Sequence, residues 1–399
     1  MPAVQIKPDV YWIGVNDRTT DLFEGIWPIT KEGVSYNAYV ICDEKKVVID
    51  LAKAFKTDEF FDRICEVTPI SDIDYVVVNH LEPDHTGVLR TLLKIAKNVT
   101  ILCSEKCKKM LGDFYGITDN IQVIQDGETL STGKRELQFF STPFVHWPET
   151  IMTYDTIDHI LFSCDAFGSY GALRGAIFDD QCIDPVFYEK EALRYYVNIV
   201  AKFSTPVLKA IQKLADVKVD IIAPSHGLVW RKDPGRIVSL YKTWAEYANG
   251  PAEKGVTLIW GSMYGNTEKM MNAVAQGISK ANIEVEIFDV ARTHSSYILP
   301  SLWSKNGIMI GAPTYEVSLF PPMAGTLNMV ALKKITGKKA AYFGSFGWSG
   351  GALKQIQQIT EPLKWEWLDT YEFTGGPTEA DLKKGEAFGF EFGKSILSS

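Results

Sequence analysis

Two different rhythms of apolar and polar residues divide the chain into a longer first part and a shorter second part. In the first part, the apolar runs at residues 36–42 and 46–51 are separated only by Asp43-Glu44-Lys45, a pattern typical of a β-hairpin. The apolar run within residues 74–79 predicts a buried strand, and a helix is expected from about Thr86 to Ala96. Further strands are predicted near residues 99–102, 121–124, 136–141, 151–154, 159–163 and 219–223, with helices near 189–201, 204–215 and 235–248.

The second part alternates strictly between strand and helix. It starts with a buried strand at 256–260 and a helix that runs to about Lys280. Further strands are predicted at 283–289, 307–310, 340–344 and near 366–371, before a closing helix from about residue 378. Such alternation predicts a doubly wound parallel sheet with helices on both faces, whereas the first part predicts an α+β layered domain in which helices cover sheets. Breakers near Gly250 place the predicted domain limits at 1–250 and 251–399.

Composition and charge exclude several classes of protein. The chain has 399 residues, of which 46% are hydrophobic and 23% charged, as in ordinary globular domains. Its net charge is −8, without a basic block, so nucleic-acid binding is not expected. The absence of a long apolar run or a secretory start argues against a membrane or secreted protein. Six cysteines without C-x-x-C pairs predict free buried thiols and a cytoplasmic location.

Three loops that follow predicted strands of the second part carry small and hydroxyl residues. The loop Gly261–Thr267 leads into a helix and offers amides and hydroxyls to a phosphate monoester. It lacks the P-loop lysine and the G-x-G-x-x-G pattern, which disfavours ATP and dinucleotides. The loops at 311–316 and 344–351 offer glycines for the close approach of a flat ring, and Tyr315 or Trp348 to stack on it, although such turns alone often only cap helices.

Together these loops resemble the flavodoxin family over residues 254–399, and the resemblance implies bound FMN. The phosphate would be held by Ser262, Met263, Tyr264, Gly265, Asn266 and Thr267. The isoalloxazine ring would be enclosed by Pro313, Thr314, Tyr315, Glu316, Ser345, Phe346, Gly347, Trp348, Ser349 and Gly350. Which aromatic side chain stacks on the ring stays open.

A dense group of potential metal ligands follows the predicted strand at 74–79. Within the segment Asn79–Gly87, alternation predicts that His80, Glu82 and Asp84 share one side, and His85 joins them where the helix begins. Three more candidates stand beside turns or strand ends: His146, Asp165 and His226. A single histidine at such a place is more often a hydrogen-bonded core residue, but the cluster at 80–85 favours a metal site.

These positions resemble the H-x-H-x-D-H motif of the metallo-β-lactamase fold over residues 1–250, and the resemblance implies an αββα domain. The motif has one departure here. Glu82 stands where that motif has its second histidine. A carboxylate is a harder, anionic donor that suits iron or manganese better than zinc. Seven ligands for two metals leave coordination positions open for a small molecule.

The combination of both parts resembles the flavodiiron proteins over nearly the whole chain. The resemblance implies two non-haem irons, one held by His80, Glu82 and His146 and the other by Asp84, His85 and His226, with Asp165 bridging. In some members the residue matching His85 is not a ligand. Tyr195 matches a tyrosine beside the ligands that hydrogen-bonds substrate, with plain helix packing as the alternative; His159 and His294 match no ligand position.

The resemblance implies an enzyme in which FMN passes electrons to the irons, reducing nitric oxide to nitrous oxide or dioxygen to water. The sequence does not decide between the gases, and we favour nitric oxide. The family also implies a head-to-tail homodimer and an external electron donor, either a rubredoxin or a reduced deazaflavin. Two alternatives remain: a zinc-dependent hydrolase fused to a flavodoxin, and a non-catalytic flavin electron carrier.

Overall fold

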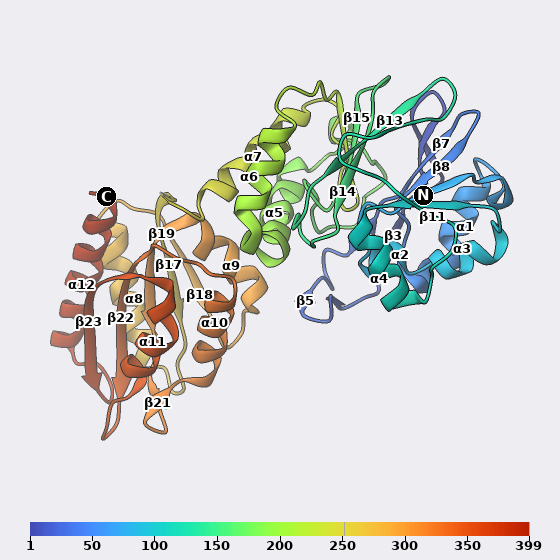
Figure 1. Ribbon diagram of the computed structural model, residues 1–399. Helices are drawn as coiled ribbons and strands as arrows, with labels where there is room; N and C mark the ends of the chain where they lie inside the picture. The colour runs from blue at the N-terminus through green and yellow to red at the C-terminus, as the bar shows by residue number, and fades with distance from the viewer. Residues whose placement is uncertain (251, 399) are drawn as a thin grey trace. The chain divides into compact units, whose positions relative to one another are not determined.

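The computed structural model describes residues 1–250 and 252–398 and divides the chain into two compact units. These units are Met1–Ala245 and Glu246–Ser399 (Figure 1). The predicted limit at residue 250 lies just after the last helix that precedes the sheet of the second unit. Residues 251 and 399 are the predicted ends of the second domain, and both lie outside the described residues. No described helix is long and apolar enough to cross a lipid bilayer.

The first unit contains a seven-stranded sheet in the order β1-β2-β7-β8-β9-β10-β11. Its first four strands pair antiparallel, whereas β8, β9, β10 and β11 run parallel. The strands are β1 (Val4–Lys7), β2 (Val10–Trp12), β7 (Tyr39–Cys42), β8 (Lys46–Ile49), β9 (Tyr75–Val77), β10 (Thr100–Cys103) and β11 (Ile121–Val123). The predicted hairpin is therefore confirmed as the β7–β8 pair.

A second, five-stranded sheet packs face to face on the first. The rings of Tyr39 on β7 and Phe162 on β15 meet between the sheets, with centroids 5.0 Å apart. Its order is β12 (Thr129–Ser131), β13 (Glu136–Ser141), β14 (Ile151–Asp155), β15 (Ile160–Cys164) and β16 (Ile221–Pro224). Two small hairpins, β3 (Val15–Asp17) with β6 (Val34–Tyr36) and β4 (Leu22–Phe23) with β5 (Trp27–Pro28), complete the strands.

Helices cover the outer sides of this sandwich, so the αββα architecture is confirmed (Figure 1). Those in the first half of the unit are α1 (Thr57–Cys65), α2 (Pro83–Thr86), α3 (Leu89–Ile95) and α4 (Glu105–Tyr115). Those in the second half are α5 (Pro185–Tyr195), α6 (Ser204–Lys213) and α7 (Pro234–Glu246). The pattern missed α1 and α4, and the helix expected at 189–201 begins earlier, at Pro185, where Asp184 accepts a hydrogen bond from Phe187 N as its cap.

The second unit is the predicted doubly wound sheet. Its strands follow the order β18 (Val285–Asp289), β17 (Glu253–Trp260), β19 (Lys305–Gly311), β22 (Lys339–Phe346) and β23 (Glu366–Thr374), all parallel. The small hairpin β20 (Thr314–Tyr315) with β21 (Ser318–Leu319) follows β19. The helices are α8 (Asn266–Lys280), α9 (Ser295–Ser304), α10 (Pro321–Leu332), α11 (Ala352–Thr360) and α12 (Glu379–Leu397).

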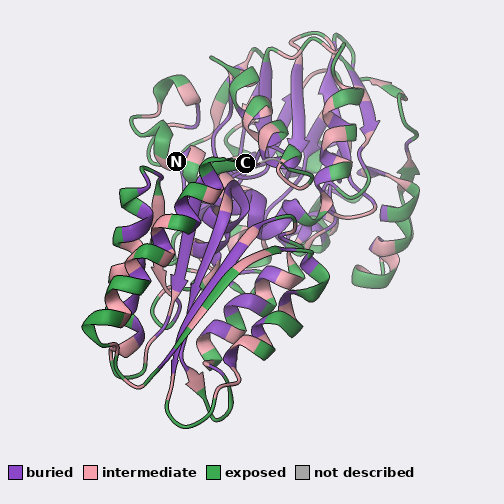
Figure 2. Ribbon diagram, turned by 90° about the vertical axis from the view of Figure 1, so that its left-hand side faces the viewer, coloured by how far each residue is buried: buried purple, intermediate pink, exposed green. Residues whose placement is uncertain are grey.

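The core of the second unit explains its continuous apolar strands. Leu258 of β17, Met309 of β19 and Phe343 of β22 pack beneath Val274 of α8 and Ile396 of α12. The central strands β17, β19 and β22 are buried on both faces, as expected for a parallel sheet, whereas the edge strands β18 and β23 are partly exposed and the helices expose one side (Figure 2). β22 begins one residue before the predicted strand at 340–344 and ends two residues after it, because pairing with β23 runs from Lys339 to Phe346.

Candidate metal centre and flavin site

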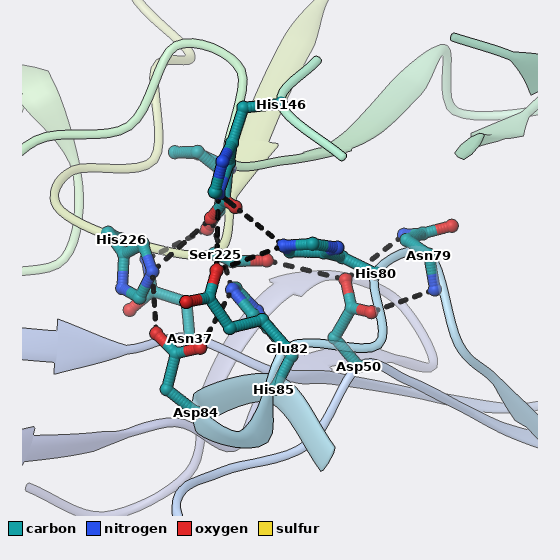
Figure 3. Close-up of polar contacts among 12 residues, drawn as sticks. Asn37, Asp50, Asn79, His80, Glu82, Asp84, His85, His146, Ser225 and His226 are labelled. Carbon is teal, nitrogen blue, oxygen red and sulfur yellow. Dashed lines mark hydrogen bonds and ion pairs between the residues drawn. The ribbon is translucent and has the colours of Figure 1, made fainter. Parts of the chain in front are cut away.

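The seven candidate metal ligands come from loops and a short helix at the ends of strands in both sheets. His80 and Glu82 follow β9, and Asp165 follows β15 directly. His146 lies between β13 and β14, and His226 follows β16. Loops of both sheets thus converge at one edge of the sandwich, so the fold gathers residues that are more than 140 positions apart (Figure 3).

One detail of the sequence prediction is wrong. Asp84 does not continue an extended segment with His80 and Glu82, because the helix α2 begins at Pro83. Proline suits the first helical position, where its missing N–H is not needed and its fixed φ is already helical. Asp84 and His85 therefore present their side chains from the first turn of α2, whereas Glu82 is the residue that precedes the helix.

The candidate ligands form two groups that share Asp165. One set of donor atoms comes from His80, Glu82, His146 and Asp165, and a second from Asp84, His85 and His226; within each, all atoms lie within 4.8 Å of one another. A third set joins His85 and Asp165 to the sulfur of Cys164.

Asp165 lies between the two groups, and each of its two carboxylate oxygens faces one group. Its Oδ2 is 3.1 Å from His146 Nε2 and 3.4 Å from His80 Nε2. Its Oδ1 is 3.1 Å from His85 Nε2 and 3.3 Å from His226 Nε2. One carboxylate therefore faces two pairs of imidazoles, which is the arrangement of a bridging ligand.

The electrostatics of the cluster favour positive charge. Burial disfavours an imidazolium, but hydrogen bonds to Glu149 and Glu82 outweigh it and raise the pKa of His80 to about 10. Burial also opposes charge on His146, yet Asp165 and Glu82 raise its pKa to about 9. Conversely, burial alone would raise the pKa of Asp165, but His85 and the other imidazoles lower it well below its usual range. Carboxylates that hold protons on several buried histidines can instead hold cations.

Several buried polar atoms of the cluster lack a hydrogen-bond partner within the described chain, which fits bound metal ions. Among the described residues, both carboxylate oxygens of Asp84 and Asp165 and Nε2 of His226 are buried without a hydrogen-bond partner of good geometry. Such orphaned atoms are costly unless another group satisfies them. They point at one another across 3.3–3.4 Å in the case of His226 with Asp165 and Asp84. Three carboxylates and four imidazoles are a donor set suited to iron.

Several buried residues that the sequence analysis did not single out support the ligand loops. Asp50 accepts hydrogen bonds from Asn79 N at 2.9 Å and from Ser225 Oγ at 3.3 Å, and so connects the residues that precede His80 and His226 (Figure 3). Asn37 Nδ2 donates to the carbonyl oxygens that flank His226, those of Pro224 and Gly227. Local patterns give no signal for these contacts, because their partners are distant in sequence.

Aromatic side chains surround the histidines. Tyr195, the last residue of α5, is fully buried, and its ring centroid lies 5.6 Å from that of His226. Phe23 meets His226 edge-on at 5.5 Å, and Trp147 meets His80 at 5.0 Å. Burial, followed by the charge of Asp165, raises the pKa of Tyr195 well above its usual range, so its hydroxyl stays protonated.

The two remaining histidines do not belong to the cluster. His159 Nδ1 pairs with the Tyr154 hydroxyl at 2.8 Å, and His294 accepts a hydrogen bond from Ser296 N as the cap of α9. All six cysteines are free, although only Cys103, Cys107 and Cys164 are buried. The prediction of free thiols is therefore confirmed, but the prediction that all are buried is wrong, because Cys65 is exposed and Cys42 and Cys182 are partly exposed.

In the second unit, the predicted phosphate loop joins β17 to α8. Ser262, Met263, Tyr264 and Gly265 form the loop, and Asn266 and Thr267 are the first residues of the helix. Ser262 Oγ accepts a hydrogen bond from Gly265 N at 2.9 Å, and Gly265 has a φ of 87°. A Cβ at Gly265 would meet no other atom, but the left-handed backbone favours glycine. The free amides at this helix start fit a phosphate dianion.

The other two predicted loops lie beside the first because β17, β19 and β22 are neighbours in the sheet. Pro313 to Glu316 run into the β20–β21 hairpin, while Ser345 and Phe346 end β22 and Gly347 to Gly350 follow it. Ala352 N donates to Thr314 Oγ1, which connects these two loops, and Thr267 lies 3.3 Å from Ser345 through their hydroxyls. Three aromatic side chains stand exposed around the site: Tyr264, Tyr315 and Trp348.

Comparison with known proteins agrees with both family resemblances. Residues 34–227 match the family model described as ODP family beta lactamase, and residues 258–389 match the flavodoxin model. An anaerobic nitric oxide reductase flavorubredoxin from Vibrio vulnificus is 34% identical over 360 residues, covering 89% of this chain and 72% of the relative. One from Salmonella typhi is 35% identical over 388 residues, covering 93% and 80%.

Solved structures resemble the chain over its full length. The rubredoxin oxygen:oxidoreductase from Desulfovibrio gigas has a TM-score of 0.94 at 29% identity, covering 99% of both chains. The flavodiiron protein from Giardia intestinalis has a TM-score of 0.94 at 31% identity, covering 100% of this chain and 97% of its own. The identity, the coverage and the two matched domains together show that this chain belongs to the flavodiiron proteins.

Proposed function

We propose that this protein is a flavodiiron oxidoreductase that reduces nitric oxide to nitrous oxide, and dioxygen to water. The observation that carries the proposal is the position of Asp165, whose two oxygens face two groups of imidazoles and carboxylates within one chain that also has a flavodoxin unit. Relatives named for nitric oxide reduction and for oxygen reduction both support it, and we favour nitric oxide.

We propose His80, Glu82 and His146 as ligands of one iron, Asp84, His85 and His226 as ligands of the other, and Asp165 as the bridge. When bound, the two irons would supply electrons and adjacent open positions for the gas, so that two nitric oxide molecules, two electrons and two protons yield nitrous oxide and water. The chain contributes four imidazoles and three carboxylates, whose charge offsets that of the cations.

The residues around the centre exclude water and hold protons in place. Phe23 and Tyr195 cover His226, and Trp147 covers His80, so the ligands lie in apolar surroundings where electrostatic interactions are strong. We propose that the protonated Tyr195 hydroxyl hydrogen-bonds the substrate, with plain packing of α5 as the alternative. Replacing Tyr195 by Phe keeps the packing, so unchanged turnover and unchanged spectra during turnover would leave only the packing role.

We propose that FMN binds with its phosphate at Ser262 to Thr267 and its ring among Pro313 to Glu316 and Ser345 to Gly350. The support is the free helix start of α8, the left-handed Gly265 and the adjacency of the three loops in the sheet. The stacking aromatic is tested by separate Trp348→Ala and Tyr315→Ala variants. The stacking position is the one whose loss weakens FMN binding and increases flavin fluorescence.

The function is tested by mixing the reduced holoenzyme with nitric oxide, and separately with dioxygen, without other gases present. We expect nitrous oxide from the first mixture, and consumption of dioxygen without released peroxide from the second. The ratio of the two rates decides the preferred gas. A reduced holoenzyme that reoxidises no faster with either gas than a free flavodoxin would contradict the proposal.

Metal analysis separates this proposal from its two alternatives. A zinc-dependent hydrolase would contain zinc, and a non-catalytic flavin carrier would contain no stoichiometric metal, whereas we expect about two irons per chain. Glu82 favours iron because a carboxylate is a harder donor than the imidazole of a zinc site. A flavodoxin unit also has no use in hydrolysis.

We further propose a head-to-tail homodimer that brings the flavin of one subunit to the irons of the other, because the two candidate sites belong to separate units. The electron donor is external, either a rubredoxin or a reduced deazaflavin; the relatives' names include rubredoxin. Donor assays with each reductant decide between them. Six free cysteines are consistent with a cytoplasmic location.

A further inference from the structure

The two groups of candidate ligands differ in what lies behind their histidines. His80 Nδ1 is 2.6 Å from Glu149 Oε1, whereas His226 Nδ1 is 2.7 Å from the main-chain oxygen of Ser35. Both outer nitrogens are buried. One group therefore has an imidazole supported by a carboxylate, and the other has an imidazole supported by a neutral carbonyl group.

The ligands themselves do not create this difference. Each group has two histidines and one unshared carboxylate, Glu82 in the first and Asp84 in the second, and Asp165 serves both. Asp50 lies near both groups: it hydrogen-bonds to Asn79, before His80, and to Ser225, before His226, and its charge acts on His85 as well as on His80. By contrast, Glu149 contacts an outer histidine nitrogen of the first group directly, which no carboxylate among the described residues does in the second group.

Glu149 is held firmly in this position. It is 1% exposed, its Oε1 also accepts a hydrogen bond from Leu81 N at 3.1 Å, and Ser104 Oγ donates to its main-chain oxygen at 2.7 Å. Its Oε2 is buried and has no hydrogen-bond partner within the described part of the chain. The negative charge of Glu149 is thus directed mainly at His80.

A carboxylate behind a ligand histidine fixes the tautomer in which Nε2 carries a lone pair toward the metal, and it makes the imidazole a stronger donor. A stronger donor stabilises the higher charge of a bound cation, and burial strengthens the effect because water does not screen it. A main-chain carbonyl orients the ring in the same way but brings no full charge. The metal position beside His80 therefore receives more electron density from its ligands than the position beside His226.

We propose that Glu149 is a positioning residue that makes the two metal positions unequal, so that the iron that His80, Glu82 and His146 would hold would lose an electron to the gas before the other iron does. This inference rests on the diiron function proposed above. Glu149 would set which of the two ions is oxidised first. The ligand set alone does not set this order, because it gives each position two histidines and one unshared carboxylate.

The test compares Glu149→Gln with the wild type as holoenzymes. Glutamine keeps an acceptor for His80 and removes the charge, so both irons and FMN should be retained. We expect the midpoint potential of the first oxidation to rise, and the Mössbauer signal of one of the two irons to change while the other stays. Glu136→Gln, an exposed glutamate on β13, is the control for loss of one negative charge and should match the wild type.

Two further variants keep the test decisive if Glu149→Gln folds poorly. Glu149→Asp keeps the charge but shortens the reach, so its potential should shift in the same direction by less. Glu149→Leu removes the hydrogen bond and should lower the affinity for one of the two irons by about 10- to 100-fold, as measured by ferrous ion titration.

The outcomes separate this inference from the proposed function. A wild-type protein that binds two irons, with an unchanged potential and unchanged Mössbauer signals in Glu149→Gln or Glu149→Asp, overturns only the role of Glu149. A wild-type protein that does not bind two irons overturns the proposed function as well. Equal changes at both irons would also overturn the inference, since it requires the effect at one.

Discussion

The carboxylate of Asp165 lies between two pairs of imidazoles, with Oδ2 toward His80 and His146 and Oδ1 toward His85 and His226. The position follows from one residue's place in the chain: Asp165 comes directly after β15, at the edge where loops of both sheets meet. Its neighbour Cys164 has a φ of 54°, which turns the chain sharply at the strand end.

Replacing Asp165 by Asn should therefore remove most of the iron while leaving the flavin in place. The amide keeps the size of the side chain but cannot bridge two cations as a charged group. We expect less than about a tenth of the wild-type iron and at least a 100-fold loss of gas reduction, on the scale seen when a central polar group is removed. Iron analysis and the flavin absorbance measure both. Asp216→Asn, an exposed position in the same unit, serves as the control.

A single buried residue is also expected to make the stability of the second unit depend on pH. Lys338 is buried, and its Nζ donates to the carbonyl oxygens of Trp303 and Lys305 at 2.6 and 2.7 Å. Burial lowers the pKa of Lys338 to about 7, far below the value of 10.5 expected in the unfolded chain. Between these two values the unfolded chain binds the proton that the folded chain releases, so stability should rise with pH in this window.

Lys338→Met should remove that dependence. Relative to the variant, the wild type should gain up to about 3 kcal/mol in the free energy of unfolding between pH 7 and pH 9. Guanidinium unfolding followed by flavin fluorescence reports on this unit. The exposed Lys354→Met is the control and should follow the wild type. Parallel pH profiles for the wild type and Lys338→Met would contradict the assignment.

At the scale of elements, α8 and α12 approach each other through glycines. A Cβ at Gly277 of α8 would lie 1.9 Å from the main-chain oxygen of Glu386, and one at Gly389 of α12 would lie 2.1 Å from that of Val274. Main-chain atoms cannot move aside as a flexible side chain can. The close packing of these two helices on the sheet therefore depends on the absence of side chains at the contact.

Gly277→Ala should destabilise the flavodoxin unit by about 1 to 3 kcal/mol, because the added methyl group forces the helices apart. The temperature at which FMN fluorescence appears on heating measures the loss. Gly325→Ala in α10 is the matched control, since a Cβ there meets no atom and alanine favours helix. The control should be as stable as the wild type or more stable, and an equally stable Gly277→Ala variant would show that the helices can separate at little cost.

At the scale of the whole molecule, the proposed head-to-tail dimer predicts that two inactive chains restore one another. Asp165→Asn lacks iron, and Thr267→Glu places a carboxylate at the start of α8 that repels the FMN phosphate. In a mixed dimer of the proposed arrangement, the flavin of the first chain would face the irons of the second.

Co-expressed chains with different affinity tags should regain about half of the wild-type activity per mixed dimer if electrons pass between subunits. Sedimentation confirms the oligomer, and each variant alone is the control. No activity in a verified mixed dimer would mean that electrons pass within one chain, and a fully active monomer would exclude the dimer altogether.

Much of the fold and the candidate site could be predicted from local pattern. The strict alternation after residue 256 predicted the parallel sheet, and the cluster at His80 to His85 predicted a metal site at a strand end. Local pattern did not predict where α2 begins, because a proline inside an apparently extended run is compatible with both a strand end and a helix start.

The sequence by itself therefore determined the architecture of both units, the loops that carry chemistry and the residue types in them, since these depend on neighbours along the chain. Only the tertiary structure decided which groups stand behind those residues. Glu149 and His80 are 69 positions apart, and Asp50 and Ser225 are 175 apart. Such contacts arise when two sheets pack face to face, and no periodicity of either segment records the partner that it will meet.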